Sequence, residues 1–183
     1  MLQKIAIRKK ALINRKKKYF EITPQFFNPL IKLLEKKNTT NTLSIYYPSN
    51  YEVNLLSLFK TLKKIKIKTL LPITKPNSQM NFIEWKYLDP LIVNNFGMLE
   101  PCLQSKPIIP NFMLIPLLAF DNKNNRLGYG KGFYDRFLNK FLKVKKNITT
   151  IGIAFSFQKY NKLPSSNLDI RLDYILTEKG LKK

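Results

Sequence analysis

The chain has no histidine, one cysteine (Cys102), and only 11 acidic residues against 33 basic ones. Without histidine, a Ser-His-Asp hydrolase, a histidine general base and most catalytic zinc sites are excluded. A single cysteine excludes an internal disulfide and is typical of a reducing compartment, so we expect a cytoplasmic protein. Any catalysis must therefore use carboxylates, lysine, arginine, tyrosine, backbone groups or a bound cation.

Long apolar runs are also missing. No stretch approaches the roughly 18 residues that a membrane span needs, and no signal-peptide core follows the basic N-terminus. We therefore expect no membrane partner. The length of 183 residues and the hydrophobic fraction of 44% suit an ordered chain with one core. We expect one domain over residues 1–183, acting as a monomer.

The formal net charge of +22 has two interpretations. One is a surface for nucleic acid or an anionic membrane. The other is compositional drift, because 28 of the 33 cations are lysine and 18 residues are asparagine, both favoured by AT-rich codons. A surface that reads phosphates or bases is expected to use more arginine, whose fork binds bidentately. We favour drift and expect no specific nucleic-acid partner, with weak non-specific binding at low salt.

Hydrophobic periodicity predicts helices alternating with strands. A basic helix is expected over residues 2–19, with Leu2, Ile5, Ala6, Leu12 and Ile13 on its buried face. Further helices are expected over residues 25–37, 54–63 and 132–144. Strands are expected over residues 42–47, 66–71 (stopped by Pro72), 81–87, 111–115, 149–155 and 172–176, and residues 97–110 as extended loop. This alternation predicts an α/β fold, a three-layer α/β/α domain with a mostly parallel sheet.

A glycine-rich segment lies directly before the predicted helix at residue 132. Gly128, Gly130 and Gly132 alternate, with Lys131 among them and Arg126 before them. Alternating glycines allow close backbone approach and positive φ, and N–H groups beside a helix N-terminus bind anions. The spacing matches neither a Walker A loop nor the dinucleotide fingerprint. The segment predicts a phosphate loop, with an ordinary strand-to-helix turn as the alternative.

The flanks of this segment make it more specific. The run Arg126-Leu127-Gly128-Tyr129-Gly130-Lys131-Gly132-Phe133-Tyr134-Asp135 resembles the signature of the 5-formyltetrahydrofolate cyclo-ligase (methenyltetrahydrofolate synthetase) family, Arg-Leu-Gly-x-Gly-x-Gly-aromatic-Tyr-Asp. Residues 115–121 are similar to the family's Pro-Gly-Leu-Ala-Phe-Asp, with Leu117 in place of the glycine. Other family-like segments follow in the family's order at residues 4–8, 47–54, 96–101 and 152–173. The resemblance covers almost the whole chain.

This resemblance implies an enzyme that closes 5-formyltetrahydrofolate to 5,10-methenyltetrahydrofolate and converts ATP to ADP and phosphate. The formyl oxygen attacks the γ-phosphate, the neighbouring folate nitrogen attacks the formyl carbon of the resulting iminium phosphate, and phosphate leaves. This chemistry needs neither histidine nor a protein nucleophile. Arg126 and Lys131 are the expected catalytic residues, because they would neutralise phosphate charge.

The resemblance also implies a set of ligand contacts. The folate is expected at Tyr47, Glu52, Tyr129, Lys131 and Phe133, since a carboxylate suits pterin N–H donors and an aromatic ring suits its flat face. Mg²⁺ is expected at Asp135 and Asp169. ATP is expected at Lys4, Ile5, Ala6, Ile7, Arg8, Arg126, Leu127, Gly128, Tyr129, Gly130, Lys131, Gly132, Phe133 and Tyr134.

Simpler interpretations stay open for several of these residues. Lys4 and Arg8 are also explained as solvated cations. Glu52 is also explained as an acid at a helix N-terminus that Asn50 caps. Asp173 is expected to be structural, in a salt bridge. For the function, the alternatives are a nucleic-acid-binding module and another ATP-dependent ligase or kinase on the same scaffold.

Overall fold

The computed structural model describes residues 2–36, 42–102, 105–142 and 147–183. The α-helices are α1 (Leu2–Lys18), α2 (Asn28–Lys36), α3 (Phe59–Lys64) and α4 (Phe133–Phe141), with short 3-10 turns at Pro24–Phe27, Leu56–Leu58, Pro76–Ser78 and Ser156–Gln158. The predicted ends of two helices, Lys37 and Val144, lie outside the described residues. None of the described helices is both long and apolar enough to cross a membrane.

Seven strands form the main sheet in the order β11-β10-β9-β6-β1-β2-β3. The four inner pairings are parallel, and the edge pairings β2–β3 and β10–β11 are antiparallel. The strands are β1 (Thr42–Ser44), β2 (Lys68–Lys75), β3 (Gln79–Glu84), β6 (Phe112–Pro116), β9 (Thr149–Ile153), β10 (Tyr174–Thr177) and β11 (Gly180–Lys182). Two small hairpins lie outside it: β4 (Leu91–Val93) with β5 (Leu99–Pro101), and β7 (Ala119–Phe120) with β8 (Arg126–Leu127).

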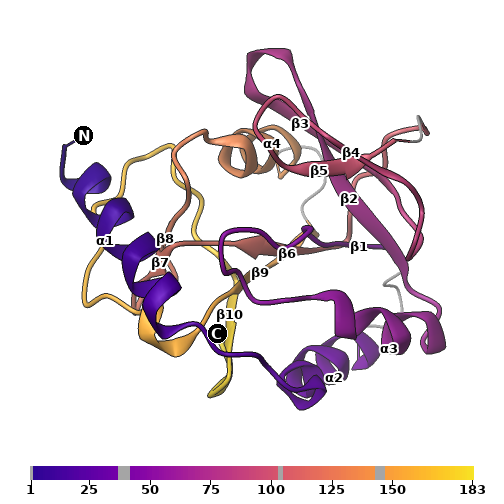
Figure 1. Cartoon of the computed structure of the whole chain (residues 1–183), viewed down its shortest axis with the longest axis horizontal. Coiled ribbons are helices and arrows are strands. Elements are labelled where there is room, and N and C mark those ends of the chain that lie inside the picture. The colour runs from indigo at the N-terminus through magenta and orange to yellow at the C-terminus, as the bar shows by residue number, and fades with distance from the viewer. Residues whose placement is uncertain (1, 37–41, 103–104, 143–146) are drawn as a thin grey trace.

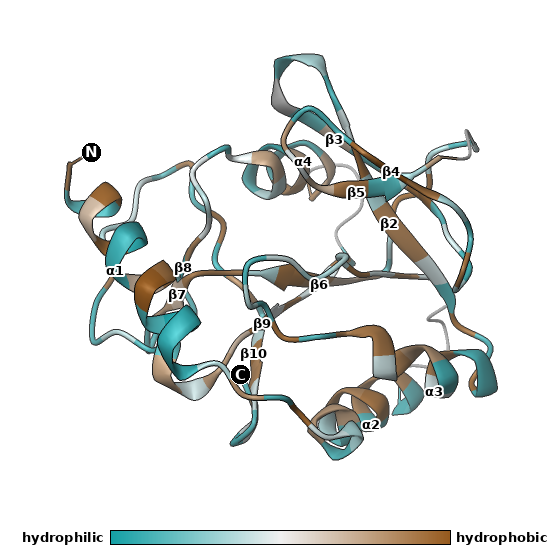
Figure 2. Cartoon of the chain, viewed as in Figure 1, coloured by the Kyte–Doolittle hydropathy of each residue, from teal (hydrophilic) through white to brown (hydrophobic). Residues whose placement is uncertain are grey.

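Helices cover both faces of this sheet, with α4 on one side and α2 and α3 on the other (Figure 1). The side chains of β6 show why both faces of the sheet need a covering layer. Phe112 and Leu114 pack into the cluster beneath α2 and α3, while Met113 and Ile115 pack into the cluster beneath α4. A strand buried on both faces is a nearly continuous apolar run, and each such side chain contributes about 1.5–3 kcal/mol when buried. The predicted α/β class with a mostly parallel sheet is confirmed, and Figure 2 shows the hydrophobic strands between the layers.

Two predictions about strands and loops are wrong. Strand β2 does not stop at Pro72 but continues to Lys75. Pro72 pairs with Phe82 of β3. The Phe82 carbonyl accepts the N–H of Ile108 on the side away from β2. The pair therefore needs no backbone N–H from residue 72, which proline lacks. The expected loop over residues 97–110 contains β5, which pairs with β4. Strands of two or three residues, such as β5, β7 and β8, are too short to show a hydrophobic period.

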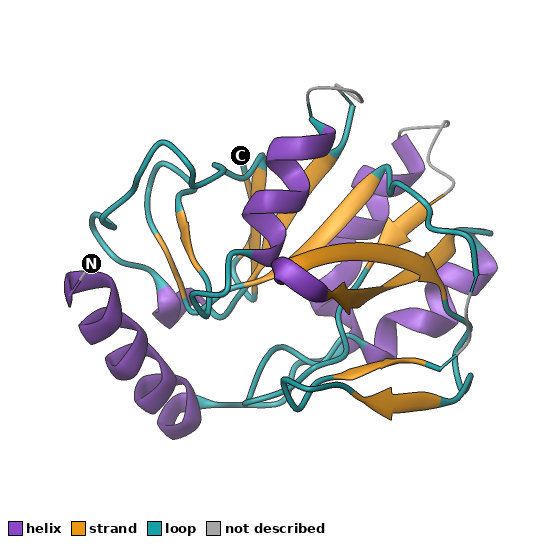
Figure 3. Cartoon of the chain, turned by 90° about the horizontal axis from the view of Figure 1, so that it is seen from above, coloured by secondary structure: helices purple, strands orange, loops and turns teal. Residues whose placement is uncertain are grey.

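The predicted buried face of α1 is also wrong. Leu2, Ile5, Leu12 and Ile13 are 38–83% exposed and face solvent. The inward face carries instead Lys4, Arg8, Ala11 and Arg15, which follow helical spacing. Figure 3 shows α1 standing apart from the other helices, with loops between it and the sheet. The helix therefore packs against polar loop backbone, and a polar inward face suits that surface.

The order of the strands predicts where a ligand binds. The chain leaves β1 for β2 on one side and later returns to place β6 on the other side of β1. In open parallel sheets, ligands bind outside the carboxyl ends of the strands at such a reversal. The loops that follow β1 and β6, residues 45–55 and 117–132, leave the sheet at this point.

Candidate active site

A cleft of about 610 Å³ lies where these loops meet, a size that suits a small organic ligand. Its walls come from α1, the loop after β1, strands β2 and β3, the β4–β5 hairpin, the glycine-rich segment and the start of α4. The lining residues are Arg8, Tyr46, Tyr47, Ser49, Asn50, Glu52, Pro72, Thr74, Met80, Phe96, Met98, Leu99, Glu100, Pro116, Arg126, Leu127, Gly128, Tyr129, Gly130, Lys131, Gly132, Phe133, Tyr134, Asp135 and Asp169.

The glycine-rich segment, residues 128–132, forms one wall between β8 and α4. Gly130 and Gly132 have φ of +97° and +68°, the left-handed region that glycine adopts without strain. At Gly130 a Cβ would lie 3.1 Å from Arg8 Cζ, so the bare backbone also lets α1 approach. Gly132 precedes the first residue of α4. The N–H groups at the start of this helix therefore lie beside the cleft. The loop therefore has the geometry of an anion site.

Upstream of the glycines, Asp121 fixes the hairpin that presents them. Its carboxylate accepts N–H groups from Lys123, Asn125 and Leu163, at 2.9–3.1 Å. Burial alone would raise the pKa of this carboxyl, but the hydrogen bonds outweigh it and lower the pKa. Asp121 is therefore an ionised anchor of the loop.

Arg126 lies at the base of the loop and is almost fully buried. Its Nη2 donates to Asp135 Oδ1 at 2.8 Å, and the guanidinium lies over the ring of Tyr134, with Cζ 5.7 Å from the centroid. Its Nε is buried and makes no hydrogen bond within the described residues. A buried donor without a partner is costly, and sites that await a ligand are where such groups occur.

The N-terminal helix brings two cations to the site: Arg8 lines the cleft, and Lys4 pairs with Asp169 of its lining. Lys4 Nζ lies 2.5 Å from Asp169 Oδ2, and Arg8 Nε donates to the Gly128 carbonyl at 2.9 Å. Burial alone would raise the pKa of Asp169, but hydrogen bonds from Lys4 and Ser166 outweigh it, so the pKa is lowered. Lys4 and Arg8 are thus engaged with the site and are not freely solvated.

Asp135 and Asp169 lie on adjoining segments. The N–H of Ile170, the residue after Asp169, donates to Asp135 Oδ1 at 3.1 Å. No group of three or more histidine, cysteine, aspartate or glutamate side chains gathers as a metal site in the part of the chain that the structure describes. Two carboxylates fit Mg²⁺, which usually takes one or two from the protein and completes its shell with phosphates and water.

Glu52, from the loop after β1, also lines the cleft and is a buried carboxylate, 7% exposed. Its Oε1 accepts from the Tyr129 hydroxyl at 2.7 Å, and its Oε2 accepts from Ser49 N–H and Oγ–H at 2.9 and 3.3 Å. Burial raises the pKa of Glu52, against the opposing charge of Arg15 and these hydrogen bonds. The interpretation of Glu52 as a capped helix terminus is wrong, because the turn after it starts at Leu56 and Asn54 Oδ1 accepts Leu56 N–H.

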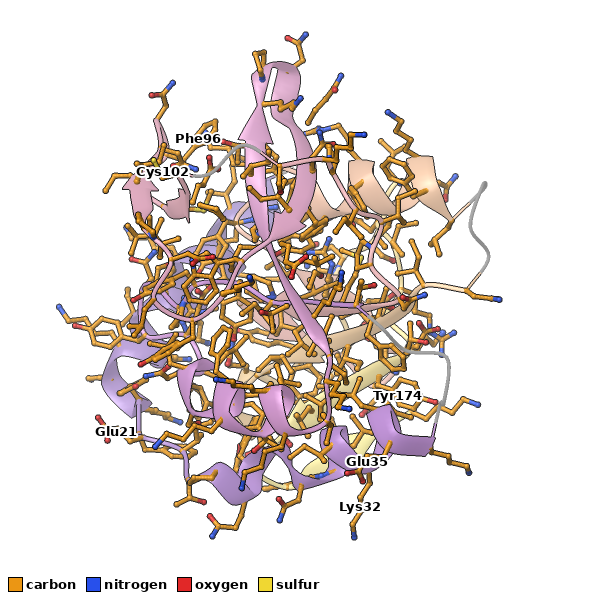
Figure 4. All side chains as sticks on the ribbon, turned by 90° about the vertical axis from the view of Figure 1, so that its right-hand side faces the viewer. Glu21, Lys32, Glu35, Phe96, Cys102 and Tyr174 are labelled. Carbon is orange, nitrogen blue, oxygen red and sulfur yellow. The ribbon has the colours of Figure 1, made fainter. Side chains whose placement is uncertain are left out.

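Aromatic side chains line the cleft as well. Phe96 packs edge-on against Phe133 with centroids 5.4 Å apart, and Lys131 Nζ lies 5.4 Å from the Phe96 centroid. Figure 4 shows Phe96 on the far side of the molecule from Lys32 and Glu35 of α2. Tyr47 packs edge-on against the buried Trp85. A flat ring system has surfaces to pack on here.

Most of the predicted site residues therefore line one cleft, with four exceptions on α1. Lys4 reaches the cleft only through its ion pair with Asp169. Ile5 and Ala6 lie on its exposed outer face and do not line the cleft. Ile7 is half-buried and packs toward the β7–β8 hairpin. Asp173 is structural, as expected, but its carboxylate accepts from Thr150 N–H and Oγ–H and does not form the predicted salt bridge.

Sequence reasoning missed two charged residues beside the cleft. Arg15 is 1% exposed beneath Tyr129, and helical spacing from Lys4 and Arg8 was the available signal. Glu100, on β5, accepts Thr74 N–H at 2.7 Å and Asn94 Nδ2–H at 2.6 Å and faces the cleft. No periodic pattern indicated it, because β5 is three residues long.

Leu117, at the position of the family glycine, is accommodated by the core. Its φ is not positive, so the turn does not require glycine there. Its side chain packs over Gly152, where an added Cβ would lie 2.7 Å from Leu117 Cδ2. Leu117 therefore adds buried apolar contact at a position whose backbone does not require glycine.

Comparison with known proteins decides among the families that such a cleft suits. A sequence profile of the 5-formyltetrahydrofolate cyclo-ligase family matches residues 3–178. The chain belongs to this family. It is 32% identical over 176 residues to the 5-formyltetrahydrofolate cyclo-ligase of Mycoplasma genitalium, covering 96% of this chain and 94% of that protein. It is 31% identical over 152 residues to that of Haemophilus influenzae, covering 80% of each.

Solved structures agree with the sequence relatives. The 5,10-methenyltetrahydrofolate synthetase of Mycoplasma pneumoniae superposes with a TM-score of 0.73 at 27% identity, covering 96% of this chain and 98% of that one. The synthetase of Aquifex aeolicus gives a TM-score of 0.74 at 28% identity, covering 100% and 93%. This cyclo-ligase chain therefore has the fold of methenyltetrahydrofolate synthetases along almost its whole length.

Proposed function

We propose that this cyclo-ligase family member converts 5-formyltetrahydrofolate and ATP to 5,10-methenyltetrahydrofolate, ADP and phosphate. One observation carries the proposal. A single cleft is lined by the glycine-rich loop, by the buried carboxylate of Glu52 and by aromatic rings. The reaction requires both substrates in one cleft, because the formyl oxygen must reach the γ-phosphorus of ATP.

The ATP phosphates would lie on the glycine loop. Its N–H groups, the α4 N-terminus, Arg8 and Lys131 converge there. Lys131 forms no ion pair within the described residues and is held only over the Phe96 ring, so its charge is free to move onto a phosphate. Arg126 and Lys131 would neutralise the charge that develops on the transferring phosphoryl group.

Asp135 and Asp169 are the residues that would hold Mg²⁺ beside these phosphates. When bound, the ion would offset phosphate charge and orient the γ-phosphate. In the structure both carboxylates pair with cations of the same site, Asp169 with Lys4 and Asp135 with Arg126. Binding of the metal–nucleotide would thus exchange partners, with carboxylates turning to the metal and cations to the phosphates.

The folate would lie toward Glu52. Three of the acceptor positions of that carboxylate are taken by Tyr129 and Ser49, which leaves acceptor capacity on Oε1 for a pterin N–H. Tyr47, Phe96 and Phe133 supply faces for the ring. This arrangement would direct the formyl group toward Lys131 and the glycine loop.

The chemistry then needs only positioning and charge neutralisation. The formyl oxygen bonds to the γ-phosphorus as ADP leaves, and the neighbouring folate nitrogen attacks the activated formyl carbon. That nitrogen gives up its proton to solvent, the carbon–oxygen bond breaks, and phosphate departs with both electrons. Holding two substrates in reacting geometry and cancelling phosphate charge are large catalytic effects without any protein nucleophile.

The direct test mixes the purified protein with 5-formyltetrahydrofolate, ATP and Mg²⁺ and follows the methenyl chromophore. We expect the chromophore to appear only when all three are present. Its absence from a folded sample would refute the proposal. A cytoplasmic location, a monomeric state and the lack of a specific nucleic-acid partner stay predictions, to be tested by fractionation, sedimentation and filter binding at physiological salt.

A further inference from the structure

Arg15 is a buried cation beside the site, and the proposed reaction gives it no direct role. It is 1% exposed and is the only fully buried cation in the part of the chain that the structure describes. It does not line the cleft, so it cannot touch a ligand directly. A buried charge is retained only where its hydrogen-bond donors are matched to acceptors.

Those donors join three loops. Nε donates to the Asn50 carbonyl at 2.9 Å, Nη1 donates to the Leu117 carbonyl at 3.2 Å, and Nη2 donates to the Tyr129 hydroxyl. The acceptors belong to the loop after β1, the turn after β6 and the glycine-rich segment. Arg15 is therefore the point at which α1 ties together the loops that carry Glu52 and the phosphate-binding glycines.

The contact with Tyr129 also sets the direction of the next hydrogen bond. A guanidinium only donates, so the Tyr129 oxygen accepts from Arg15. The single hydroxyl proton is then directed to Glu52 Oε1, 2.7 Å away. Arg15, Tyr129 and Glu52 therefore form a relay of two hydrogen bonds, in which Arg15 donates to Tyr129 and Tyr129 donates to Glu52. Tyr129 fills a position that the glycine-loop signature leaves open, so the signature does not account for this relay.

The turn that presents Glu52 needs such support. Asn50 and Tyr51, neither of them glycine, have φ of +48° and +62°, a conformation that side chains disfavour. The Asn50 carbonyl is the one that Arg15 Nε holds. Without this bond, nothing else described on α1 would fix the turn at that residue.

Arg15 also supplies the positive charge that faces Glu52. The other groups that act on this carboxylate are Tyr46 after β1, Tyr129 in the glycine-rich segment and Tyr134 on α4. Burial raises the pKa of each of these three tyrosines above the ordinary tyrosine value, so all three stay neutral near pH 7. Burial raises the pKa of Glu52 too, and the charge of Arg15 is the largest influence that lowers it.

We propose that Arg15 is a positioning residue for the folate subsite, acting through Tyr129 to fix the orientation of the Glu52 carboxylate. The inference rests on the proposed function, because it assigns the relay to that substrate. It also explains why the inward face of α1 carries arginine where a packed helix usually carries leucine. The substrate class served is a fused heterocycle with adjacent N–H donors, which an oriented, ionised carboxylate recognises.

The test measures equilibrium binding of 5-formyltetrahydrofolate, and separately of ATP, to Arg15→Gln, Tyr129→Phe and the double variant. Lys16→Gln, at the exposed next position of α1, is the matched control. We expect each single variant to bind the folate about tenfold more weakly at pH 7, as for loss of one hydrogen bond to a charged group. The double variant should lose little more than either single one. ATP affinity should fall less than folate affinity, and Lys16→Gln should bind both ligands as wild type does.

The pH dependence separates positioning from general damage. Because Glu52 must be ionised to accept the pterin donors, folate binding weakens as pH falls through its pKa. Arg15→Gln should move this acid limb to higher pH, because the charge that lowers the pKa of Glu52 is removed. Three results would overturn the proposal: additive losses of folate affinity in the double variant, an acid limb that does not move in Arg15→Gln, or equal losses of ATP and folate affinity. If Arg15→Gln fails to fold, Tyr129→Phe decides, since it keeps Arg15 and interrupts only the relay. A wild type that binds no folate would instead refute the proposed function.

Discussion

Replacing Asp169 should strengthen the binding of ATP in the absence of metal, which is an uncommon outcome for a proposed metal ligand. Lys4 Nζ lies 2.5 Å from Asp169 Oδ2, and the two side chains are 23% and 25% exposed. Exposed ion pairs contribute about 0.2–1 kcal/mol, and this quarter-exposed pair belongs at the upper end. Asp169→Asn removes that competition and releases Lys4 to the phosphates.

A gain of about 1 kcal/mol corresponds to roughly fivefold tighter binding. Calorimetric titration with ATP in a chelator should show this gain for Asp169→Asn, whereas titration with Mg²⁺ present should show weaker binding than wild type. Removing a negative charge would also reduce repulsion of the phosphates, so the double variant with Lys4→Met is the control. If the gain persists without Lys4, the ion pair is not its source, and the partner exchange proposed above is wrong.

Three further predictions test other parts of the site. Glu52→Gln should weaken 5-formyltetrahydrofolate binding by about 10- to 100-fold, as for 1.5–3 kcal/mol, while circular dichroism shows an intact fold; wild-type affinity would remove Glu52 from the folate site. Gly130→Ala should lower ATP affinity, because φ at this position is +97° and the new Cβ would lie 3.1 Å from Arg8 Cζ. The control is Gly180→Ala, at φ +109° with open space around it, which should lower only the stability of the fold. Equal effects of the two variants on ATP affinity would argue against the Arg8 contact. Asp121 has a lowered pKa in the folded protein, so its ionised form stabilises above the unfolded value of about 3.9, and this stability is lost as pH falls through the folded pKa. Denaturation midpoints of wild type and Asp121→Asn should converge below about pH 4, and a constant gap would contradict this role.

Local patterns in the sequence were sufficient for part of the fold. The strand at residues 112–116 could be predicted because both of its faces are buried, which leaves an uninterrupted apolar run. The glycine-rich segment could be placed because positive φ and close approach require glycine locally. These features depend on residues a few positions apart, so a single sequence contains them.

Features set by distant neighbours were not predictable in the same way. Pro72 can stay inside its strand only because the backbone N–H and C=O of Phe82 do not face it. The register between β2 and β3 decides this orientation. The inward face of α1 was misjudged because the helix packs on loop carbonyls, for which a cation is the better partner than leucine. The pairing of Lys4 with Asp169 spans 165 positions and follows only from the folded arrangement.

The central claim is that one cleft couples ATP cleavage to folate cyclisation. The most direct measurement counts both products in a single reaction of wild-type protein with 5-formyltetrahydrofolate, ATP and Mg²⁺. The account predicts one ADP for each methenyl group formed, and neither product in appreciable amount when either substrate is omitted. ADP released without the methenyl chromophore, or neither product from a folded sample, would contradict it.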